Sequence, residues 1–437
     1  MRPSNGPVTA ANEKTAGVNS RTAFALAASL FPAWGFLTAL NDVLVPYMKD
    51  LFQLNYVQAM LVPFVSYLCY LLVAQPAGRL VNTIGYKKTM TSGLLIMGFG
   101  AFCIVLASFV PIYGIFLAAL MTIGGGMVFL QVTANPYITL LEPPELATSR
   151  LSLAQAFCSL AKTAAPYLGA VFILGATERF HAGDNSVRAT YLAGRFSADA
   201  ASLRLPYFII GSALIALAQL IRSYDMPGFD YTLRRRDRGT MRSSPWWKSP
   251  EHNRLIMGVA GIFLYVGAEV SIGSFLVNYL RQSEIGNMQA MAAAKCVSVY
   301  WGGDMLGRFV GSAIMRKVDP RIVLLSASTL AVCLVGTSIV STGWTAVVAI
   351  LLVGICNSTM FPIIFSLSVR GLGSQTGTAS GLLVSGIVGG AVIPMLQGVM
   401  ADKAGIQRGF FVPLACYLYI FIFALKQNRR PQVILGT

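Results

Sequence analysis

Long stretches of apolar side chains limit most strongly what this chain can fold into. The segment 113–141 contains no charged residue. About 20 apolar residues in a helix are enough to cross a bilayer. Across the 437 residues, 55% are hydrophobic and only 11% are charged, whereas roughly a quarter are charged in an ordinary soluble domain. The sequence therefore predicts an all-α membrane protein that crosses the bilayer many times.

The apolar segments predict twelve membrane-spanning helices in two groups of six. The first group is expected at about Thr22–Met48, Tyr56–Pro76, Thr89–Phe109, Tyr113–Leu141, Leu151–Leu174 and Pro206–Tyr224. The second group is expected at about Leu255–Leu280, Ala292–Met315, Ile322–Val340, Trp344–Val369, Gly377–Met400 and Gly409–Leu425. An even number of spans places both termini on one side of the membrane.

The distribution of positive charge predicts which side that is. The net charge is +16, and the loops on the side of the termini carry about 21 Lys and Arg against about seven on the other side. Cytoplasmic loops are enriched in these residues, so we expect both termini in the cytoplasm. The expected divisions are a tail at 1–21, a six-helix bundle at 22–224, a basic linker at 225–254, a second bundle at 255–425 and a tail at 426–437.

The two groups of helices carry matching landmarks at a nearly constant offset. Asp42 matches Glu269, Gly78-Arg79 matches Gly307-Arg308, Pro136 matches Pro362, and Pro166 matches Pro394, at offsets of 227, 229, 226 and 228 residues. Four coincidences in register indicate two related bundles with a binding cavity between them. A parallel repeat of two six-helix halves is the layout of major facilitator transporters.

The residues of the chain give no support for catalytic or metal chemistry. Seven cysteines lie in apolar segments without a C-x-x-C pair, and the two histidines, His181 and His252, lie in separate polar loops. We expect the cysteines to be small core residues. No nucleophile–base pairing or phosphate-binding loop accompanies them, so we expect no enzyme activity, catalytic residue, metal site or cofactor.

The segment "PAGRLVNTIGYKK" after the second apolar stretch resembles the loop signature of the major facilitator superfamily. Its residues Gly78, Arg79, Gly85 and Lys87 supply a tight basic turn, because Gly permits turn geometry and close helix approach. Arg308 is the matching cation in the second half. Such a signature indicates the fold and carries no information about the substrate.

Ionisable residues inside membrane spans are costly and are therefore candidates for function. Asp42 lies beside Asn41 in the first span, and Glu269 lies near the middle of the seventh. Each is a candidate for proton coupling, with a structural acid as the alternative, and Glu269 is also a candidate for binding a sugar hydroxyl. Lys162 lies in the fifth span, where it could pair with Asp42 or Glu269 or respond to a coupling cation.

Neutral amides and aromatic rings in the spans fit a neutral polyol ligand. Amides both donate and accept hydrogen bonds, and aromatic rings pack against the apolar faces of a pyranose. A clamp between packed helices is the alternative for the amides, and Asp304 and Arg308, four residues apart, could simply neutralise each other. The expected substrate-binding residues are Asn41, Gln131, Asn135, Gln155, Glu269, Asn278, Tyr300, Trp301 and Asn357.

Several spans are similar to the fucose-permease-like (fucose:proton symporter) family of the major facilitator superfamily, and most of all to its bacterial glucose/galactose transporters. The matching segments include "GFLTALNDVLVP" at 35–46, "FLQVTANPY" at 129–137, "SRLSLAQAF" at 149–157, "LYVGAEVSIGSFLVNYL" at 264–280, "YWGGDMLGRFVGS" at 300–312, "NSTMFPIIFSL" at 357–367 and "GGAVIPMLQGVMAD" at 389–402.

The resemblance implies a hexose importer of a bacterial inner membrane, coupled to a proton or to sodium and working by alternating access. Asp42 matches the Asp that such permeases use in proton coupling, while Gln131 is neutral where fucose permeases have Glu. Cys158 and Lys162 depart from the residues usual in the group. Alternatives are an efflux antiporter for a small polar metabolite or drug, a non-transporting sugar sensor, or a carrier of fucose or N-acetylglucosamine. We expect a hexose and the lipid bilayer as partners, no nucleic acid, and a monomer.

Overall fold

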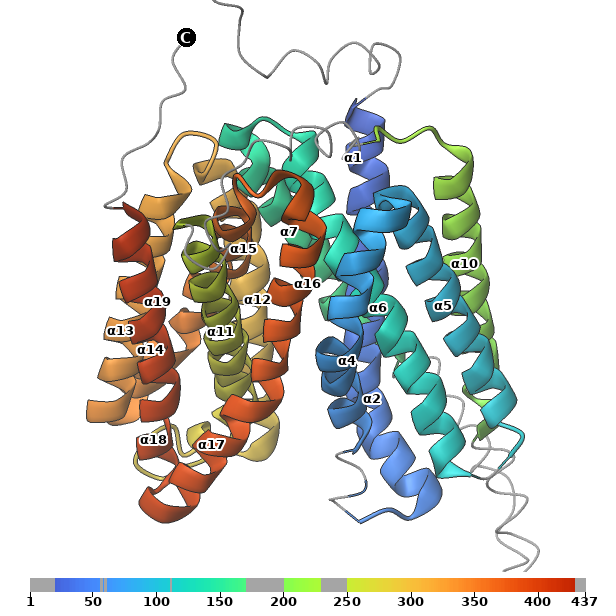
Figure 1. The fold of residues 1–437 in the computed structure, drawn as a ribbon. Coiled ribbons are helices and arrows are strands. Elements are labelled where there is room, and N and C mark those ends of the chain that lie inside the picture. The colour runs from blue at the N-terminus through green and yellow to red at the C-terminus, as the bar shows by residue number, and fades with distance from the viewer. Residues whose placement is uncertain are drawn as a thin grey trace, which may run out of the picture.

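The computed structural model describes residues 20–55, 58, 61–110, 112–169, 200–228 and 250–428, and the regular structure in these ranges is entirely helical. Two bundles of helices lie side by side (Figure 1). The helices of the N-terminal half are α1 (Ser20–Ala28), α2 (Leu30–Phe52), α4 (Leu61–Ile84), α5 (Tyr86–Ala107), α6 (Tyr113–Leu141), α7 (Pro144–Gly169) and α10 (Arg204–Ser223).

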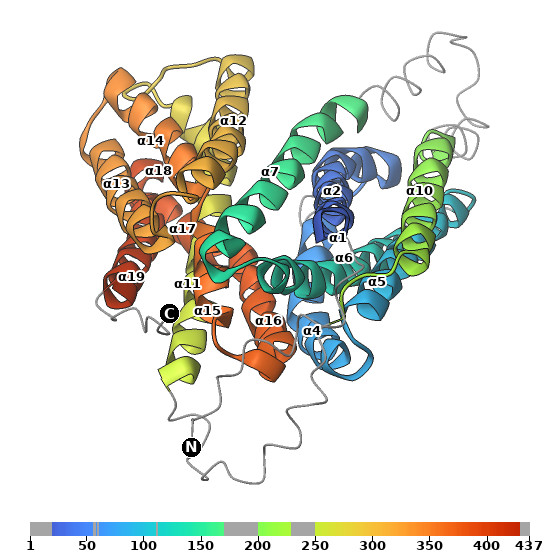
Figure 2. The same cartoon turned by 90° about the horizontal axis from the view of Figure 1, so that it is seen from above.

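The C-terminal half has the same general plan with more interruptions. Its helices are α11 (Pro250–Leu280), α12 (Ala290–Ile314), α13 (Pro320–Val340), α14 (Gly343–Asn357), α15 (Met360–Val369), η4 (Gly373–Gln375), α16 (Thr376–Ser385), η5 (Gly386–Val388), α17 (Gly389–Ala404), α18 (Ile406–Gly409) and α19 (Phe411–Asn428). The halves meet mainly where α7 packs on α12 and α4 packs on α16, as Figure 2 shows from above.

Ten helical stretches of the described chain are long and apolar enough to cross a membrane. The helices α7 and α12 lie beside them in the bundles, and ten plus two gives the twelve predicted spans. Both carry charged residues within their length, among them Lys162 in α7 and Asp304 and Arg308 in α12. The predicted all-α fold is confirmed, and the two least apolar spans are those at the junction of the halves.

The turn between the second and third spans is shorter than the sequence predicted. We expected a helix to end at Pro76, but α4 continues through this proline to Ile84, since neighbouring groups can satisfy the carbonyl that a proline releases within a membrane span. Gly78 and Arg79 therefore lie inside α4. Gly85 alone separates α4 from α5, with φ at +84°, a conformation that favours glycine.

Several spans that the sequence predicted as continuous are interrupted. The first divides at Ser29, between α1 and α2, and two later breaks lie before prolines. The helix before Pro362 breaks at Ser358 and Thr359, between α14 and α15. A proline ring clashes with the carbonyl four residues earlier, which here is the carbonyl of Ser358. In the next span the short 3₁₀ helix η5 separates α16 from α17 and precedes Pro394.

Two predicted helix starts were late. α7 begins at Pro144 instead of Leu151, and α11 begins at Pro250 instead of Leu255. Proline is favoured in the first turn of a helix, because its fixed φ suits that position and its missing N–H would be unpaired there in any case. Both helices therefore extend beyond the apolar stretches from which they were predicted.

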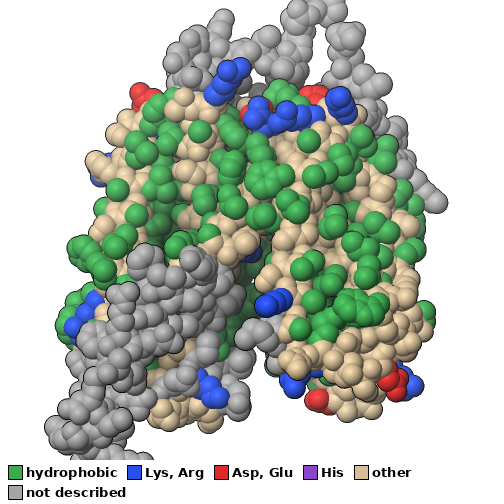
Figure 3. Space-filling model, turned by 180° about the vertical axis from the view of Figure 1, so that it is seen from behind, with side chains coloured by type: hydrophobic (Ala, Val, Ile, Leu, Met, Phe, Trp, Pro, Cys, Tyr) green, Lys and Arg blue, Asp and Glu red, His purple; other side chains and the backbone are tan. Residues whose placement is uncertain are grey.

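The outer surface of the bundles is suited to contact with lipid. Large apolar side chains are exposed on it, for example Phe99 on α5, Val340 at the end of α13 and Met395 on α17. Figure 3 shows hydrophobic side chains spread over the middle of the molecule, with Lys and Arg near its two ends. Most of the predicted basic linker and most of both predicted tails lie outside the described residues.

Candidate functional site

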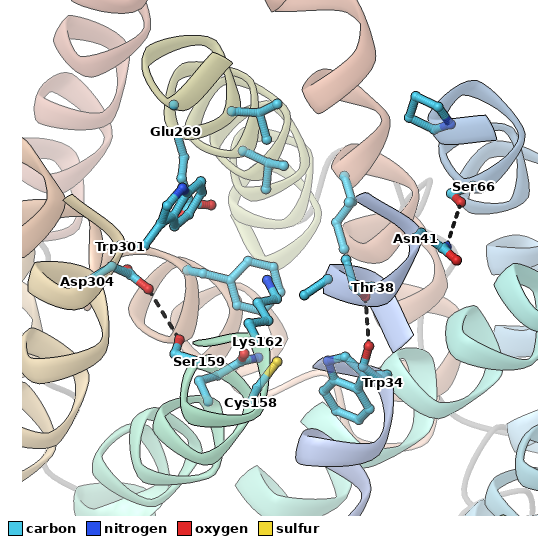
Figure 4. A pocket seen from close by; sticks show the side chains of 18 of the residues that line it. Trp34, Thr38, Asn41, Ser66, Cys158, Ser159, Lys162, Glu269, Trp301 and Asp304 are labelled. Carbon is cyan, nitrogen blue, oxygen red and sulfur yellow. Dashed lines mark hydrogen bonds between the residues drawn. The ribbon is translucent and has the colours of Figure 1, made fainter. Parts of the chain in front are cut away.

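A cavity of about 670 Å³ lies between the two halves, within the usual range of roughly 300–1,000 Å³ for small-molecule sites. Its walls come from α2, α4, α6 and α7 on one side and from α11, α12, α15 and η5 on the other. Side chains from both halves point into it (Figure 4). The site is therefore completed only when the two bundles come together.

The halves are in close contact at one end of the molecule, which we call the termini end because α1 begins and α19 finishes there (Figure 1). At this end Ser149 donates from Oγ to the carbonyl of Ser312 at 2.7 Å, and Ser312 donates back to the carbonyl of Ser149 at 2.9 Å. Asn82 on α4 donates to the hydroxyl of Thr378 on α16 at 2.7 Å. These bonds close the cavity toward the termini.

The cavity-lining residues lie toward the opposite ends of their helices. On α4, which begins at the end away from the termini, they run from Pro63 to Tyr70. On α7 and α11, which begin at the termini end, they are found at 155–163 and 265–274, from about the middle of each helix onward. The cavity thus lies on the far side of the inter-half contacts.

The N-terminal wall presents neutral amides and hydroxyls. Asn41 donates from Nδ2 to the hydroxyl of Ser66 at 3.3 Å, as drawn in Figure 4. Its Oδ1 is buried and has no hydrogen-bond partner among the residues that the structure describes, and the side chain lines the cavity. Gln131 donates from Nε2 to the hydroxyl of Tyr70 at 2.7 Å. An unsatisfied buried acceptor is unfavourable, so Asn41 is prepared for a ligand that donates a hydrogen bond.

A second layer of amides holds this wall in place. Gln155 donates to Oδ1 of Asn135 at 3.3 Å, and Asn135 donates to the carbonyl of Gln131 at 2.9 Å. Asn135 is fully buried and does not line the cavity, whereas Gln131 and Gln155 do. Asn135 therefore holds the side chain of Gln155 and links it to the main chain of α6 at Gln131.

The C-terminal wall contains a charged trio, formed by Glu269, Asp304 and Arg308. Arg308 binds Asp304 in a bidentate manner, with Nε–Oδ2 at 2.9 Å and Nη2–Oδ1 at 3.0 Å. It also approaches Glu269, with Nη2–Oε1 at 3.6 Å. Tyr265 donates to the same Oε1 at 2.8 Å. Two carboxylates thus share one guanidinium in a buried setting.

Buried hydroxyls and an amide support the trio from behind. Tyr300 donates to the carbonyl of Glu269 at 3.4 Å, Asn357 donates to the hydroxyl of Tyr300 at 2.7 Å, and Tyr417 donates to Oδ1 of Asn357 at 2.7 Å. Trp301, next to Tyr300, is only partly buried and lines the cavity. Of these two neighbouring aromatic residues, Trp301 and not Tyr300 is therefore the one that a ligand in the cavity could contact.

The junction of α7 and α12 brings the halves together at the edge of the cavity. Ser159 donates to Oδ2 of Asp304 at 3.2 Å. Lys162, about one turn farther along α7, extends into the cavity (Figure 4) and forms no ion pair with any residue that the structure describes. Cys158 also lines the cavity and is buried.

Comparison with known proteins accounts for this architecture. A family model described as "Major Facilitator Superfamily" matches residues 23–394. The chain belongs to the major facilitator superfamily. It is 42% identical over 399 residues to the glucose/galactose transporter of Brucella abortus, which covers 91% of this chain and 92% of the relative. It is 30% identical over 405 residues to the L-fucose-proton symporter of Escherichia coli strain K12, which covers 92% of each chain.

The fold agrees with a solved member of the superfamily. The fucose:proton symporter FucP in the outward conformation superposes with a TM-score of 0.81 at 29% identity, over 93% of this chain and 99% of that one. The expected likeness to the fucose-permease-like family is confirmed by these relatives, and the named members are transporters, not enzymes.

Five of the predicted substrate-binding residues of this chain lie at the cavity surface: Asn41, Gln131, Gln155, Glu269 and Trp301. The side chain of Asp42 lies outside the described residues, so its predicted coupling role remains a prediction. Those that the structure places elsewhere are Asn135, Tyr300 and Asn357, which are buried behind the walls, and Asn278, which is exposed and does not line the cavity.

Sequence reasoning missed one wall of the cavity. Pro63, Ser66, Tyr67 and Tyr70 on α4 all line it. Their spacing of three and four residues places them on one helix face, and this periodicity is the signal that could have identified them. It missed Tyr265 as well, which is four residues before Glu269 on α11 and therefore on the same face.

The predicted loop signature is divided between two environments. Arg79 is exposed and Lys87 is partly buried near the termini end, beside the Gly85 turn. Arg308 occupies a corresponding place in α12, about two turns before the helix ends, but it is buried in the charged trio. The match between Arg79 and Arg308 therefore holds for position in the repeat and does not extend to their contacts.

Proposed function

We propose that this chain imports a neutral hexose of the glucose or galactose type together with a proton, across a bacterial inner membrane, by alternating access. The 42% identity to a glucose/galactose transporter over nearly the whole chain supports the substrate class. The observation that carries the proposal is the cavity itself. Both halves of the molecule form its walls, and contacts between the halves close it at the termini end.

The chemistry of the cavity wall suits a sugar. Asn41, Gln131 and Gln155 present amides that both donate and accept hydrogen bonds. Trp301 offers an aromatic face on the opposite wall. The unpartnered Oδ1 of Asn41 would accept a hydrogen bond from a sugar hydroxyl. A large apolar drug would leave these polar groups without partners, which is unfavourable.

The charge pattern supports an orientation with both termini in the cytoplasm, because basic residues concentrate in the loops on that side. In this orientation the contacts between Ser149 and Ser312 close the cytoplasmic side. The cavity then faces outward, which agrees with the outward conformation of the solved symporter. We infer that the structure represents the state that receives sugar from outside.

Coupling to a proton is proposed for Asp42 and Glu269. Both are carboxylates within spans, where carrying a charge through a closed state is unfavourable, and protonation removes that charge. Gln131 cannot contribute, since it is a neutral amide. Because a ligand shifts a conformational equilibrium only through its different affinity for the two states, sugar and proton would act together by favouring closure.

Counterflow in proteoliposomes tests the proposal directly. The purified full chain is reconstituted with an unlabelled hexose inside, and entry of labelled glucose is measured against a panel of hexoses, fucose and amino sugars, at two pH values and with or without sodium. Saturable exchange of glucose or galactose that accumulates sugar only under a proton gradient is expected. Binding without exchange would identify a sensor, and drug extrusion without sugar exchange would identify an efflux antiporter.

A further inference from the structure

The two walls of the cavity carry opposite charges that the sugar-binding role does not use. The N-terminal wall contributes one cation, Lys162, whose side chain is exposed to the cavity. The C-terminal wall contributes the charged trio. With Glu269 and Asp304 ionised and Arg308 protonated, the trio has a net charge of −1, so the charges of Lys162 and the trio cancel among the described side chains.

Arg308 cannot neutralise both of its carboxylate partners. Its bidentate contacts go to Asp304, at 2.9 and 3.0 Å, and bidentate pairs of this kind are the strongest that a guanidinium makes with a carboxylate. Glu269 receives only the longer contact of 3.6 Å, with a hydrogen bond from Tyr265. The surplus negative charge of the C-terminal wall therefore resides mainly on Glu269.

Lys162 is placed to meet this surplus when the halves approach each other. Ser159, one turn before it, already bridges to Asp304 across the junction at 3.2 Å, so the next turn of the same helix face points toward the trio. Closure on the outer side would bring the ammonium and the carboxylate closer and would exclude the water between them.

Closing the cavity over an unbalanced charge is strongly unfavourable, because a buried charge needs a partner. We propose that Lys162 is the counter-charge for the trio, so that the outer side closes over Glu269 without a proton being taken up there. This inference rests on the proposed transport cycle and narrows the proposed coupling from two carboxylates to one, with Asp42 carrying the proton and Glu269 remaining ionised. Lys162 is in this view a positioning residue that acts through Glu269, and not a sugar ligand.

Among the described side chains, no other group around Lys162 changes this balance. Facing it are Glu269 from α11 and Asp304 and Arg308 from α12, and on its own helix Cys158 lies one turn earlier as a neutral thiol. On α2, Asp42 is the remaining titratable candidate near the cavity. The pH dependence is therefore measured both in the wild-type chain and in the Asp42→Asn background, so that the two sources of a proton effect are separated.

A charge-balance set of variants tests the proposal by hexose counterflow in proteoliposomes. Lys162→Met should lower counterflow at least about tenfold at about pH 8. It should recover toward the wild-type rate at about pH 5.5, because a proton on the trio replaces the lost charge. Lys162→Arg, which keeps the charge, should stay within about threefold of wild type. Asp304→Asn alone should lower counterflow at both pH values, without recovery in acid, because it leaves the positive charge of Lys162 without a balancing negative charge.

The double variant Lys162→Met/Asp304→Asn restores neutrality. Its rate of hexose counterflow should exceed that of both single variants, a non-additivity that misfolding does not produce.

A second measurement needs no substrate. A membrane-impermeant maleimide reacts with the cysteine of Ser274→Cys, at a position that lines the cavity and is exposed. Adding Lys162→Met should make this reaction at least about threefold faster at about pH 8, since the outer side closes less often, and the double variant should reverse the change.

Two results would overturn the inference. One is a labelling rate at Ser274→Cys that does not change when Lys162→Met is added, and the other is a double variant whose counterflow is no faster than that of Lys162→Met. A wild-type chain that exchanges no hexose would instead defeat the proposed function. The labelling comparison would still decide the role of Lys162 in that case, because it reports opening and closure of the cavity without any sugar.

Discussion

Asn41 and Asn278 show how one residue type is given different tasks by its position. Asn41 is 6% exposed and lines the cavity with an unpartnered Oδ1, whereas Asn278 is exposed, outside the cavity, on α11. Both are amides in predicted spans, and residue type alone does not reveal which face of a helix they occupy. The sequence could therefore predict which residue types form the site better than which individual residues line it.

The amide pair gives the first prediction. Asn41→Ala should raise the KM for hexose about fivefold to tenfold, the effect of losing a hydrogen bond worth roughly 1 kcal/mol to the ligand. Asn278→Ala is the matched control and should leave KM unchanged. Initial rates of counterflow at varied sugar concentration measure both. Equal KM values for Asn41→Ala and wild type would exclude Asn41 as a sugar ligand.

Asp42 gives the second prediction. Asp42→Asn should abolish uphill accumulation of hexose under a proton gradient while leaving part of the counterflow, because the amide mimics a permanently protonated acid and exchange requires no net proton movement. Accumulation and counterflow are measured in the same proteoliposomes with and without an imposed gradient. A variant that accumulates sugar as well as wild type would remove Asp42 from the coupling step.

At the scale of single helices, prolines and glycines caused both the successes and the errors of sequence reasoning. The spans were found because hydropathy is a property of the sequence itself. Helix ends were harder, since Pro76 lies inside α4 while Pro362 follows a real break between α14 and α15. Whether a proline interrupts a helix depends on which neighbours satisfy the released carbonyl, and those neighbours belong to the tertiary structure.

The contact between α4 and α16 gives the third prediction. A Cβ added at Gly78 would lie 2.6 Å from the carbonyl oxygen of Gly377, so the two helices could not approach as closely at the termini end. Gly78→Ala should therefore destabilise the contact that closes this end and lower counterflow at least about fivefold, the effect of roughly 1 kcal/mol of overpacking.

Gly336→Ala on α13 is the matched control, because a Cβ there would meet no atom within 4 Å. It should transport like wild type. A fluorescence-detected size-exclusion profile of both variants separates a shifted conformational equilibrium from misfolding. Normal transport by a well-folded Gly78→Ala would show that the halves close without the tight helix contact.

At the scale of the molecule, the internal repeat was the most informative property of the sequence. Landmarks such as Asp42 and Glu269, 227 residues apart, indicated two bundles and a cavity between them before any contact was known. What the repeat could not predict is how its two copies differ. Gly307-Arg308 keeps the position of Gly78-Arg79, yet Arg308 is buried while Arg79 is exposed, because Arg308 has Asp304 and Glu269 as partners in the cavity wall.

Alternating access requires that the contacts between the halves be strong enough to close one end and weak enough to be exchanged. At the termini end the bonds joining Ser149 with Ser312 are formed by neutral hydroxyls and carbonyls. Each such hydrogen bond contributes only roughly 0.5–1.5 kcal/mol, so the end can open without separating buried charges. The hydroxyl oxygens of the two serines lie 3.3 Å apart, close enough for a covalent replacement to be designed.

The last prediction follows from that distance. The pair Ser149→Cys/Ser312→Cys, oxidised in the membrane, should form a disulfide that holds the termini end closed and abolishes counterflow, while reduction restores it. Labelled hexose should still bind, since the cavity remains open on its other side. Each single cysteine variant treated with the same oxidant is the control, because it contains all seven native cysteines without the new pair. If the cross-linked protein transported at the rate of the reduced protein, the termini end would not have to open, and alternating access between these two bundles would be wrong.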